Sequence, residues 1–459
     1  LGEEFAADRV TLYDAISLAR LTDDKGAALD LTATPTIFFV ERDGKLMQEL
    51  RITAAGVDHD EPVKVDVRAG VDTVGTGTLG AAKLGTATGT ALIEEAPQPR
   101  HLSVPLTAGK QSRTVSLTQE PQKKWRIYVA PSVHTDIGYT HVQSEVIAVQ
   151  ERNTDLAIEL VREFPLYHWN LESSWVAQWW LRDTPPARHE ELLQAARERR
   201  VGIEAGYLNM LTGLCSEEEL IRNLYFSARL NRLYGVPFES FTITDAPSHV
   251  WTVPSILAGA GIRCISVGIN SVRAPLFKKE IHRKSPFLWE GPDGARVLTW
   301  FATGYAQAGN IGLNDGFDRM RTAVEGDLTW WSKRADYPYD AILLHGAYSD
   351  NVTGTKHIAQ TITEYAKHYA YPKVIMCANN DFFTHIEKNF ADKIPTVRGC
   401  GGSWWEDGAG STAYETGVNR VAHEDVVSAE KAWALLKTCD KSAKVPQDQF
   451  DTAWDNILL

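Results

Sequence analysis

The chain has 459 residues, which is too long for one ordinary domain and predicts two or three. Its composition, 44% hydrophobic and 23% charged, is typical of a globular protein in water. The net charge of −12 and the lack of a basic cluster lead us to expect no nucleic-acid partner. No apolar run reaches the roughly 18 residues of a membrane span, so none is expected.

The cysteines are scattered, odd in number and without CxxC spacing; they are Cys215, Cys264, Cys377, Cys400 and Cys439. This pattern argues against a disulfide framework and against a thiolate zinc site. The chain begins at Leu1 without a signal-like apolar segment, so we expect a removed leader or a missing start. We favour a secreted or periplasmic location over a cytoplasmic one, and the sequence gives no indication of oligomeric state.

Residues 1–123 differ from the rest because short apolar strands alternate there with Gly, Asp, Thr and Pro. The strands are expected at 36–40, 63–67, 91–93 and 113–117. Lys64 and Asp66 alternate with valines, which gives one wet and one dry face and predicts a small β-sandwich-like domain. The stretch 70–89 is rich in Gly, Thr and Ala and predicts turns or a flexible loop.

Residues 124–412 change to an alternation of strands and helices. Strands are expected at 125–130, 167–170, 201–205, 240–244, 263–267, 341–344 and 373–376, and helices at 144–163, 217–233, 253–260, 316–334, 356–368 and 381–389. A Gly-Pro-Asp-Gly turn at 291–294 predicts a hairpin, and Ser216 with Glu219 forms a capping box. This rhythm predicts parallel strands with helices outside, closed or nearly closed into a barrel whose chemistry lies at the strand carboxyl ends.

Residues 413–459 read as the incomplete beginning of a helical bundle. A long helix is expected at 417–436, and a second begins near Asp448, with Phe450, Trp454 and Ile457 at helical spacing. Because the second helix has no stop signal, we expect Phe450 and Trp454 to lack packing partners and to be partly exposed.

One motif stands out where the first strand of the alternating region ends. His134 and Asp136 follow an apolar strand and, two residues apart, point to the same side of it. An imidazole nitrogen and a carboxylate oxygen in this arrangement can bind one Zn²⁺ ion. The ordinary interpretation of such spacing is a solvated loop. The carboxylates further along the chain decide between a metal site and such a loop.

Several further strand ends carry carboxylates. Asp245 follows the strand at 240–244, Asp350 lies beyond the strand at 341–344, and Glu406 follows a Trp-Trp pair. By the barrel rule these groups meet at one rim. Paired carboxylates are what glycoside hydrolysis requires, because one attacks or orients while the other delivers a proton.

The chain from Trp125 to Leu459 resembles glycoside hydrolase family 38, the α-mannosidase family. Four segments carry the resemblance in order: His134-Thr135-Asp136, Ser216–Arg222, Thr244–Pro254 and Phe287–Leu298. The resemblance implies an α/β fold, a seven-stranded β/α barrel followed by a three-helix bundle. It also implies a carbohydrate substrate and a retaining, exo-acting, α-mannosidase-like hydrolase that forms a covalent glycosyl-enzyme intermediate.

The same resemblance assigns roles to individual residues. His134, Asp136 and Asp245 map onto zinc ligands, Asp245 doubles as the nucleophile, and Asp350 maps onto the general acid/base. A further histidine ligand is expected beyond Leu459. Residues 246–248 replace the family's usual Phe-Gly after the nucleophile, so the sugar specificity stays open.

We further predict substrate contacts for three aromatic residues and for one glutamate that follows a Trp-Trp pair. Aromatic rings pack in cores but also stack on sugar rings. They are Trp175, Tyr139, Trp405 and Glu406. His249 and His345 compete with His134 as metal ligands, but neither lies in a His-x-Asp pair at a strand end.

Three alternatives differ from a mannosidase. The same fold could act on a non-mannose glycoside. A metal-dependent carbohydrate deacetylase on a similar barrel would need an Asp-Asp pair after the first strand, where only Asp136 is present. A non-catalytic carbohydrate-binding protein would keep the barrel without turnover, and the presence of Asp245 and Asp350 argues against it.

Overall fold

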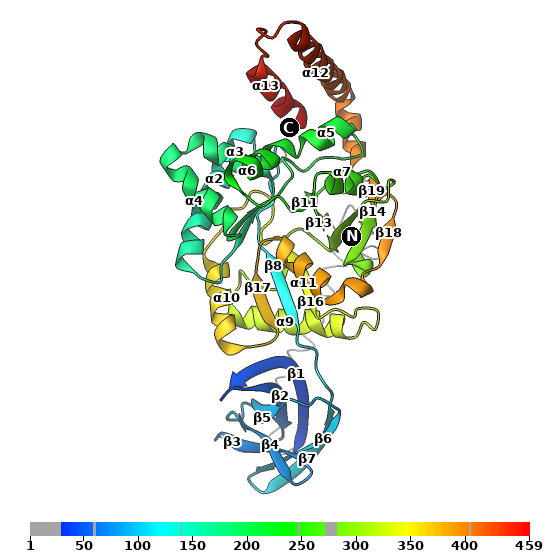
Figure 1. The fold of residues 1–459 in the computed structure, drawn as a ribbon. Helices are drawn as coiled ribbons and strands as arrows, with labels where there is room; N and C mark the ends of the chain where they lie inside the picture. Colours follow the sequence, from blue (N-terminus) through cyan, green and yellow to red (C-terminus); the bar gives the residue numbers. More distant parts are fainter. Residues whose placement is uncertain (1–28, 58–60, 139, 247, 271–281, 404) are drawn as a thin grey trace. The chain divides into compact units, whose positions relative to one another are not determined.

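The computed structural model describes residues 29–57, 61–138, 140–246, 248–270, 282–403 and 405–459. The chain forms two compact units (Figure 1). The first runs up to Trp125 and includes Glu325–Arg334 and Ala366–Lys373, and the second contains the rest.

The strands of the first unit form one curled antiparallel sheet of seven, in the order β1-β2-β5-β4-β3-β6-β7. Their bounds are β1 Asp30–Arg42, β2 Lys45–Ala55, β3 Val63–Ala69, β4 Asp72–Leu79, β5 Thr86–Glu94, β6 Arg100–Ala108 and β7 Gln111–Gln119. In the described part of residues 1–123, the regular elements are all strands. These strands belong to a single sheet that curls over its own core rather than to two stacked sheets.

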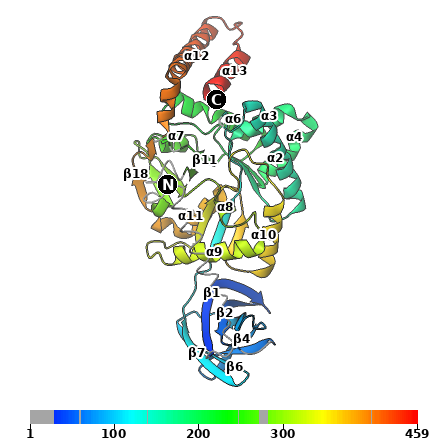
Figure 2. The same cartoon turned by 180° about the vertical axis from the view of Figure 1, so that it is seen from behind.

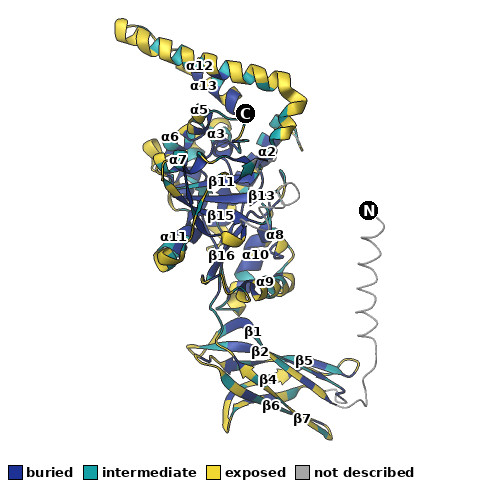
Figure 3. Ribbon diagram, turned by 90° about the vertical axis from the view of Figure 1, so that its right-hand side faces the viewer, coloured by how far each residue is buried: buried dark blue, intermediate teal, exposed yellow. Residues whose placement is uncertain are grey.

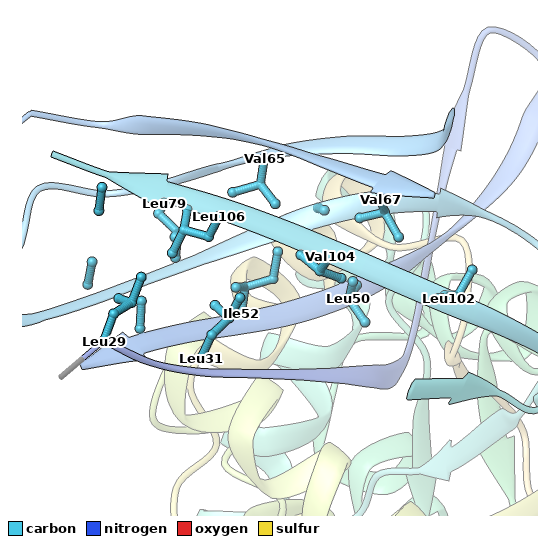
Figure 4. Packing of buried hydrophobic residues seen from close by; sticks show 14 of the residues in the cluster. Leu29, Leu31, Leu50, Ile52, Val65, Val67, Leu79, Leu102, Val104 and Leu106 are labelled. Carbon is cyan, nitrogen blue, oxygen red and sulfur yellow. The ribbon is translucent and has the colours of Figure 1, made fainter. Parts of the chain in front are cut away.

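Alternation of side chains builds that core. Val65 and Val67 of β3 are buried at 1% and 0% exposure, whereas Lys64 and Asp66 between them are exposed. The expected wet and dry faces are thus confirmed. Aliphatic side chains from several strands meet on the dry face (Figure 4), and burial of each contributes about 1.5–3 kcal/mol relative to exposure.

The expected loop at 70–89 is wrong, because β4 and the start of β5 occupy most of it. The glycines there serve close strand approach. A Cβ at Gly77 would lie 2.3 Å from the carbonyl oxygen of Thr90, and one at Gly89 would lie 2.0 Å from that of Thr78. Gly and Thr in this segment allow tight pairing instead of breaking the strand.

The second unit carries its strands in several sheets. Parallel pairs join β8 to β16, β9 to β10, and β11 to β13 to β15. The bounds are β8 Arg126–Ala130, β9 Trp169–Leu171, β10 Val201–Ile203, β11 Ser240–Asp245, β12 Ser248–His249, β13 Cys264–Ile269, β14 Phe287–Glu290, β15 Arg296–Ala302, β16 Ala341–His345, β17 Lys373–Met376, β18 Thr396–Arg398 and β19 Gly402–Ser403. The hairpin β14–β15 is confirmed, and the fold class is mixed α/β.

Helices follow most of these strands, and the two opposite views show them around the strands of the unit (Figure 2). They are α2 Gln143–Glu163, α3 Ser174–Asp183, α4 Pro186–Arg197, α5 Glu217–Arg222, α6 Tyr225–Tyr234, α7 Val253–Gly259, α8 Gln307–Asn310, α9 Phe317–Ser332, α10 His357–His368 and α11 Asn380–Phe390. The capping box of Ser216 and Glu219 is confirmed at the start of α5. The single helix expected at 217–233 is instead broken into α5 and α6.

Two further helices, α12 (Ala413–Cys439) and α13 (Gln447–Leu458), end the chain. The expected exposure of Phe450 and Trp454 is wrong, since they are only 8% and 5% exposed. Trp454 Nε1 donates to Glu430 at 2.9 Å, and the Arg222 guanidinium lies 4.6 Å from the ring centroid. Much of the α12 surface is nevertheless exposed (Figure 3). In the described part of the chain, no helix has the length and apolar character needed to cross a bilayer.

Candidate active site

Two loops meet because the pairing of β8 with β16 continues past the ends of both strands. Val133 forms a parallel bridge with Tyr348, and the Asn351 amide donates to the carbonyl of His134 at 2.9 Å. The loop that carries the His-x-Asp motif therefore runs beside the loop that carries Asp350. This register brings together two parts of the chain that lie more than two hundred residues apart.

His134 forms the buried centre of the site, with 3% of its surface exposed. Its Nδ1 lies 2.8 Å from Oε1 of Glu172, whose side chain is 1% exposed. Its Nε2 faces Oδ2 of Asp245 at 3.7 Å, which is too long for a hydrogen bond. A proton on Nδ1, held by Glu172, leaves the Nε2 lone pair directed at Asp245 in the neutral ring.

Opposing effects set the charge of this imidazole in the absence of metal. Burial lowers the pKa of His134, but the carboxylate of Glu172 raises it by charge and hydrogen bonding. Asp245 and Asp350 raise it further, so that the pKa of His134 is about 9. The surroundings of the ring thus favour a positive charge at this position, which a metal cation would also supply.

Asp245 ends β11 in a strained backbone conformation with φ of +64°. The amide of Ala246 donates to the carbonyl of Thr244 at 2.7 Å, so Asp245 lies at the centre of a three-residue turn. Its Oδ1 accepts a 2.7 Å hydrogen bond from Asn270 Nδ2. Burial raises the pKa of Asp245, and the charge of His134 and the Asn270 hydrogen bond act in the opposite direction.

Asp350 is held by a tyrosine. The Tyr305 hydroxyl donates to Oδ1 of Asp350 at 3.0 Å, and the Tyr305 ring packs against His134 with centroids 4.9 Å apart. Burial and the charges of Asp245 and Asp350 raise the pKa of Tyr305, so the phenol stays protonated and acts as a donor. One ring therefore contacts both the imidazole and the second carboxylate.

Asp136 is positioned through its backbone. The side-chain amide of Asn351 accepts from the Asp136 amide at 3.2 Å and donates to the Asp136 carbonyl at 2.6 Å. The Asp136 carboxylate lies near enough to raise the pKa of Asp245 by charge repulsion. The clamp by Asn351 explains how this loop keeps its shape beside Asp350.

The metal prediction can be compared with the donor geometry. Two zinc ligands at a tetrahedral angle lie about 3.4 Å apart, given bonds of roughly 2.1 Å to nitrogen and oxygen. The 3.7 Å between His134 Nε2 and Asp245 Oδ2 is close to this spacing, and Glu172 supplies the usual outer partner of a ligand imidazole. In the described ranges, however, no group of three or more His, Cys, Asp or Glu side chains is gathered tightly enough to hold a metal ion.

The two competing histidines have different surroundings. His345 is buried, with Nδ1 3.1 Å from the Ser266 hydroxyl and Nε2 3.3 Å from the Thr244 hydroxyl. Burial, helped by the charge of His134, lowers the pKa of His345 to about 4. Burial likewise lowers the pKa of His249 to about 3. His345 thus braces neighbouring strands, and His134 Nε2 lies 3.7 Å from Oδ2 of Asp245.

The four predicted substrate contacts fall in different places. Trp175 is 1% exposed and packs against Trp179 at 5.9 Å between ring centroids, so its ring faces the core rather than a substrate. Tyr139 lies outside the described residues. Trp405 and Glu406 are partly exposed, and Glu406 accepts a hydrogen bond from the hydroxyl of Ser248, which follows Asp245 by three positions.

Four residues of the site were missed in the sequence: Glu172, Asn209, Asn270 and Tyr305. Three of them follow a strand closely, Glu172 after β9, Asn270 after β13 and Tyr305 after β15. The rule that chemistry lies at strand carboxyl ends could have found these three. Asn209 comes six residues after β10, and no sequence signal marks it.

The sequence profile described as "Glycosyl hydrolases family 38 N-terminal domain" matches residues 124–399, which is more than half of the chain. The chain therefore belongs to glycosyl hydrolase family 38 and carries the N-terminal domain of a glycoside hydrolase. A comparison with curated protein sequences finds no match.

Two solved structures share the fold. An alpha-mannosidase from Enterococcus faecalis V583 has a TM-score of 0.51 and 16% identity, covering 60% of this chain and 31% of that one. A glycosyl hydrolase family 38 protein from Enterococcus faecalis has a TM-score of 0.53 and 16% identity, covering 73% and 35%. The chain thus spans about a third of either structure.

Proposed function

We propose that this chain forms the catalytic part of a zinc-dependent, retaining glycoside hydrolase of the α-mannosidase type. One observation carries the proposal. His134 and Asp245 face each other at a distance suited to a shared metal, beside Asp350 held by Tyr305. Family membership and the fold shared with an alpha-mannosidase support the choice of sugar.

In the proposed reaction Asp245 attacks the anomeric carbon. The bond from that carbon to the leaving oxygen breaks as the bond to Asp245 forms, and Asp350 delivers its proton to the leaving oxygen. Asp350 then takes a proton from water, whose oxygen bonds to the anomeric carbon and releases Asp245. We expect carboxyl groups about 5–5.5 Å apart, as retaining enzymes require.

We propose that His134, Asp136 and Asp245 would hold zinc. When bound, the ion supplies positive charge that can anchor vicinal sugar hydroxyls. Glu172 holds Nδ1 of His134 and thereby presents Nε2, and Asn270 holds one oxygen of Asp245 while the other faces the imidazole. Tyr139, Trp405 and Glu406 are proposed substrate contacts.

We infer that the parallel strands of residues 124–412 correspond to the family's seven-stranded β/α barrel. Residues 1–123 would form a separate β domain, and residues 413–459 would begin the helical bundle. The strand ends that carry His134, Asp245, Asn270 and Tyr305 would then share one rim.

The proposal is tested by measuring zinc content and turnover on a panel of aryl glycosides that includes α-mannoside and other sugars. We expect hydrolysis of the α-mannoside, its loss after chelation, and its recovery on adding zinc. His134→Ala should lose zinc, while Lys64→Ala, which changes an exposed residue of the β unit, should keep it. Deacetylation without glycoside hydrolysis, or sugar binding without turnover, would contradict the proposal.

A further inference from the structure

A partly buried chain of hydrogen bonds connects the two groups that the proposed function uses most. Oε1 of Glu172 accepts from His134 Nδ1 and also from Nδ2 of Asn209. Oδ1 of the same Asn209 accepts from the backbone amide of Thr244 at 3.1 Å. Asn209 thus joins the acceptor that orients the imidazole to the backbone amide of Thr244, the residue before Asp245.

The second end of this chain is a strained place in the backbone. Asp245 has a φ of +64°, and such a conformation in a residue other than glycine costs free energy and persists only where its neighbours impose it. Asn209 holds the Thr244 amide where the chain enters the turn, and the Ala246-to-Thr244 hydrogen bond closes the turn. A group that holds the Thr244 amide therefore helps to determine where the Asp245 carboxylate points.

The polar atoms of Asn209 are matched to both neighbours. An amide side chain has donors on one end and an acceptor on the other, so it can satisfy a carboxylate and a peptide N–H at once. A serine or a carboxylate in its place could not span both with the same polarity. The remaining oxygen of Glu172 is buried without a hydrogen-bond partner among the described residues, so the position of Glu172 rests on Oε1.

We propose that Asn209 is a positioning residue that couples the orientation of His134 to the strained turn of Asp245, and so fixes both metal-binding groups in register. This inference rests on the proposed function for its catalytic consequence, but the coupling itself is a property of the protein without metal. Asn209 acts through Glu172 and Thr244, and it contacts neither the reacting atoms nor the metal.

The first test measures hydrogen exchange of residues 240–246 in the metal-free protein. Asn209→Ala should raise exchange in this segment about tenfold, because the Thr244 amide loses its acceptor. Glu172→Leu should raise it as well, because Asn209 loses its anchor, but should add little in the Asn209→Ala background. Glu172→Gln keeps an oxygen that can accept from Asn209, so residues 240–246 should exchange more slowly in this variant than in Glu172→Leu.

The second test measures zinc affinity by chelator competition, and kcat and KM on an aryl α-mannoside. Outer partners of metal ligands typically change affinity by 10–100-fold, and Asn209→Ala should lie near the lower end of that range. We expect kcat to fall about tenfold with KM little changed, because orientation of the reacting groups is lost rather than sugar binding. Asn231→Ala is the matched control, since it removes a 2.8 Å bond to the carbonyl of Val236 at the end of α6.

The inference is overturned if Asn209→Ala matches Asn231→Ala in exchange, zinc affinity and kcat. It is also overturned if the effects of Glu172→Leu and Asn209→Ala on exchange simply add. A wild-type chain that binds no zinc and hydrolyses no glycoside would remove the proposed function, and the exchange measurements would then still decide the coupling. A folded Asn209→Ala protein keeps the test open even where Glu172→Leu fails to fold.

Discussion

The two units of this chain both bury apolar cores, but they differ in how many ionisable side chains they bury with them. In the first, the curled sheet closes over Leu, Ile, Val and Ala, such as Leu50 at 0% exposure. In the second, ionisable groups are buried at or just beyond strand ends, among them His134, Glu172 and His345. Burying an ionisable group costs free energy unless a partner compensates it, so these groups offset part of the stability that the second unit gains from its own apolar core.

Glu204 extends this contrast. It follows β10, and burial raises its pKa to about 7, while hydrogen bonds from Ser240, Thr242 and Asn379 act in the opposite direction. The first unit can therefore be altered with consequences for stability alone, whereas the polar interior of the second should respond in activity and metal binding.

The largest effect is expected for Asp245→Asn. Because the amide cannot form the glycosyl ester, turnover should fall at least about 1000-fold. Asn tolerates a positive φ well, so the fold should persist. Steady-state kinetics and thermal unfolding of the same preparation provide the measurement. Full activity in a folded Asp245→Asn protein would exclude Asp245 as the nucleophile.

Asp350→Ala should separate substrates by their leaving groups. Loss of the proton donor should reduce turnover of poorly activated glycosides about 100- to 10,000-fold, and that of activated aryl glycosides much less. Both kcat values are compared with those of Tyr305→Phe, which keeps the carboxylate and removes only its hydrogen bond. Equal losses on both kinds of substrate would count against Asp350.

Leu50→Ala tests the first unit. Leu50 is fully buried, so truncation should lower the free energy of unfolding by about 2–5 kcal/mol, from lost burial and a new cavity. Zinc content and kcat below the unfolding temperature should stay unchanged. Lys64→Ala, on the exposed face, should change stability by less than about 0.5 kcal/mol. A loss of zinc in Leu50→Ala would show that a change in the core of the first unit also affects metal binding in the second.

Glu172→Gln should change the pH dependence of the metal-free protein. The pKa of His134 is raised to about 9 from its ordinary value near 6.5. Protonation of His134 therefore contributes fully to the free energy of unfolding below pH 6.5, and this contribution is lost as pH rises through 9. This contribution is up to about 3 kcal/mol. Removing the charge of Glu172 should reduce the fall in unfolding free energy at high pH, as measured by urea unfolding between pH 6 and about 9.5.

The matched control for that variant is Glu218→Gln, because Glu218 is a near-surface carboxylate bonded to Arg222. Glu218→Gln should leave the fall in unfolding free energy at high pH as it is in the wild type. An identical pH profile for wild type and Glu172→Gln would mean that Glu172 does not set the protonation of His134.

Much of the local structure follows from short stretches of sequence. Alternation around Lys64 and Asp66 gave the sheet faces, the Ser216 capping box gave the start of α5, and the Gly-Pro-Asp-Gly turn gave the β14–β15 hairpin. These signals are local, because each depends on residues only a few positions apart. The motif at His134 and the acid at Asp245 were also identified from strand ends, since parallel strands deliver such residues to one side.

How those residues are held depends on contacts between distant segments of the chain. Glu172, Asn209 and Tyr305 are ordinary in sequence and acquire a role because separate strands bring them beside His134, Asp245 and Asp350. The burial of Trp454 likewise depends on Arg222 and Glu430, far away in the chain. Pairing across such distances depends on register and packing rather than on local preference, so composition and spacing do not encode it.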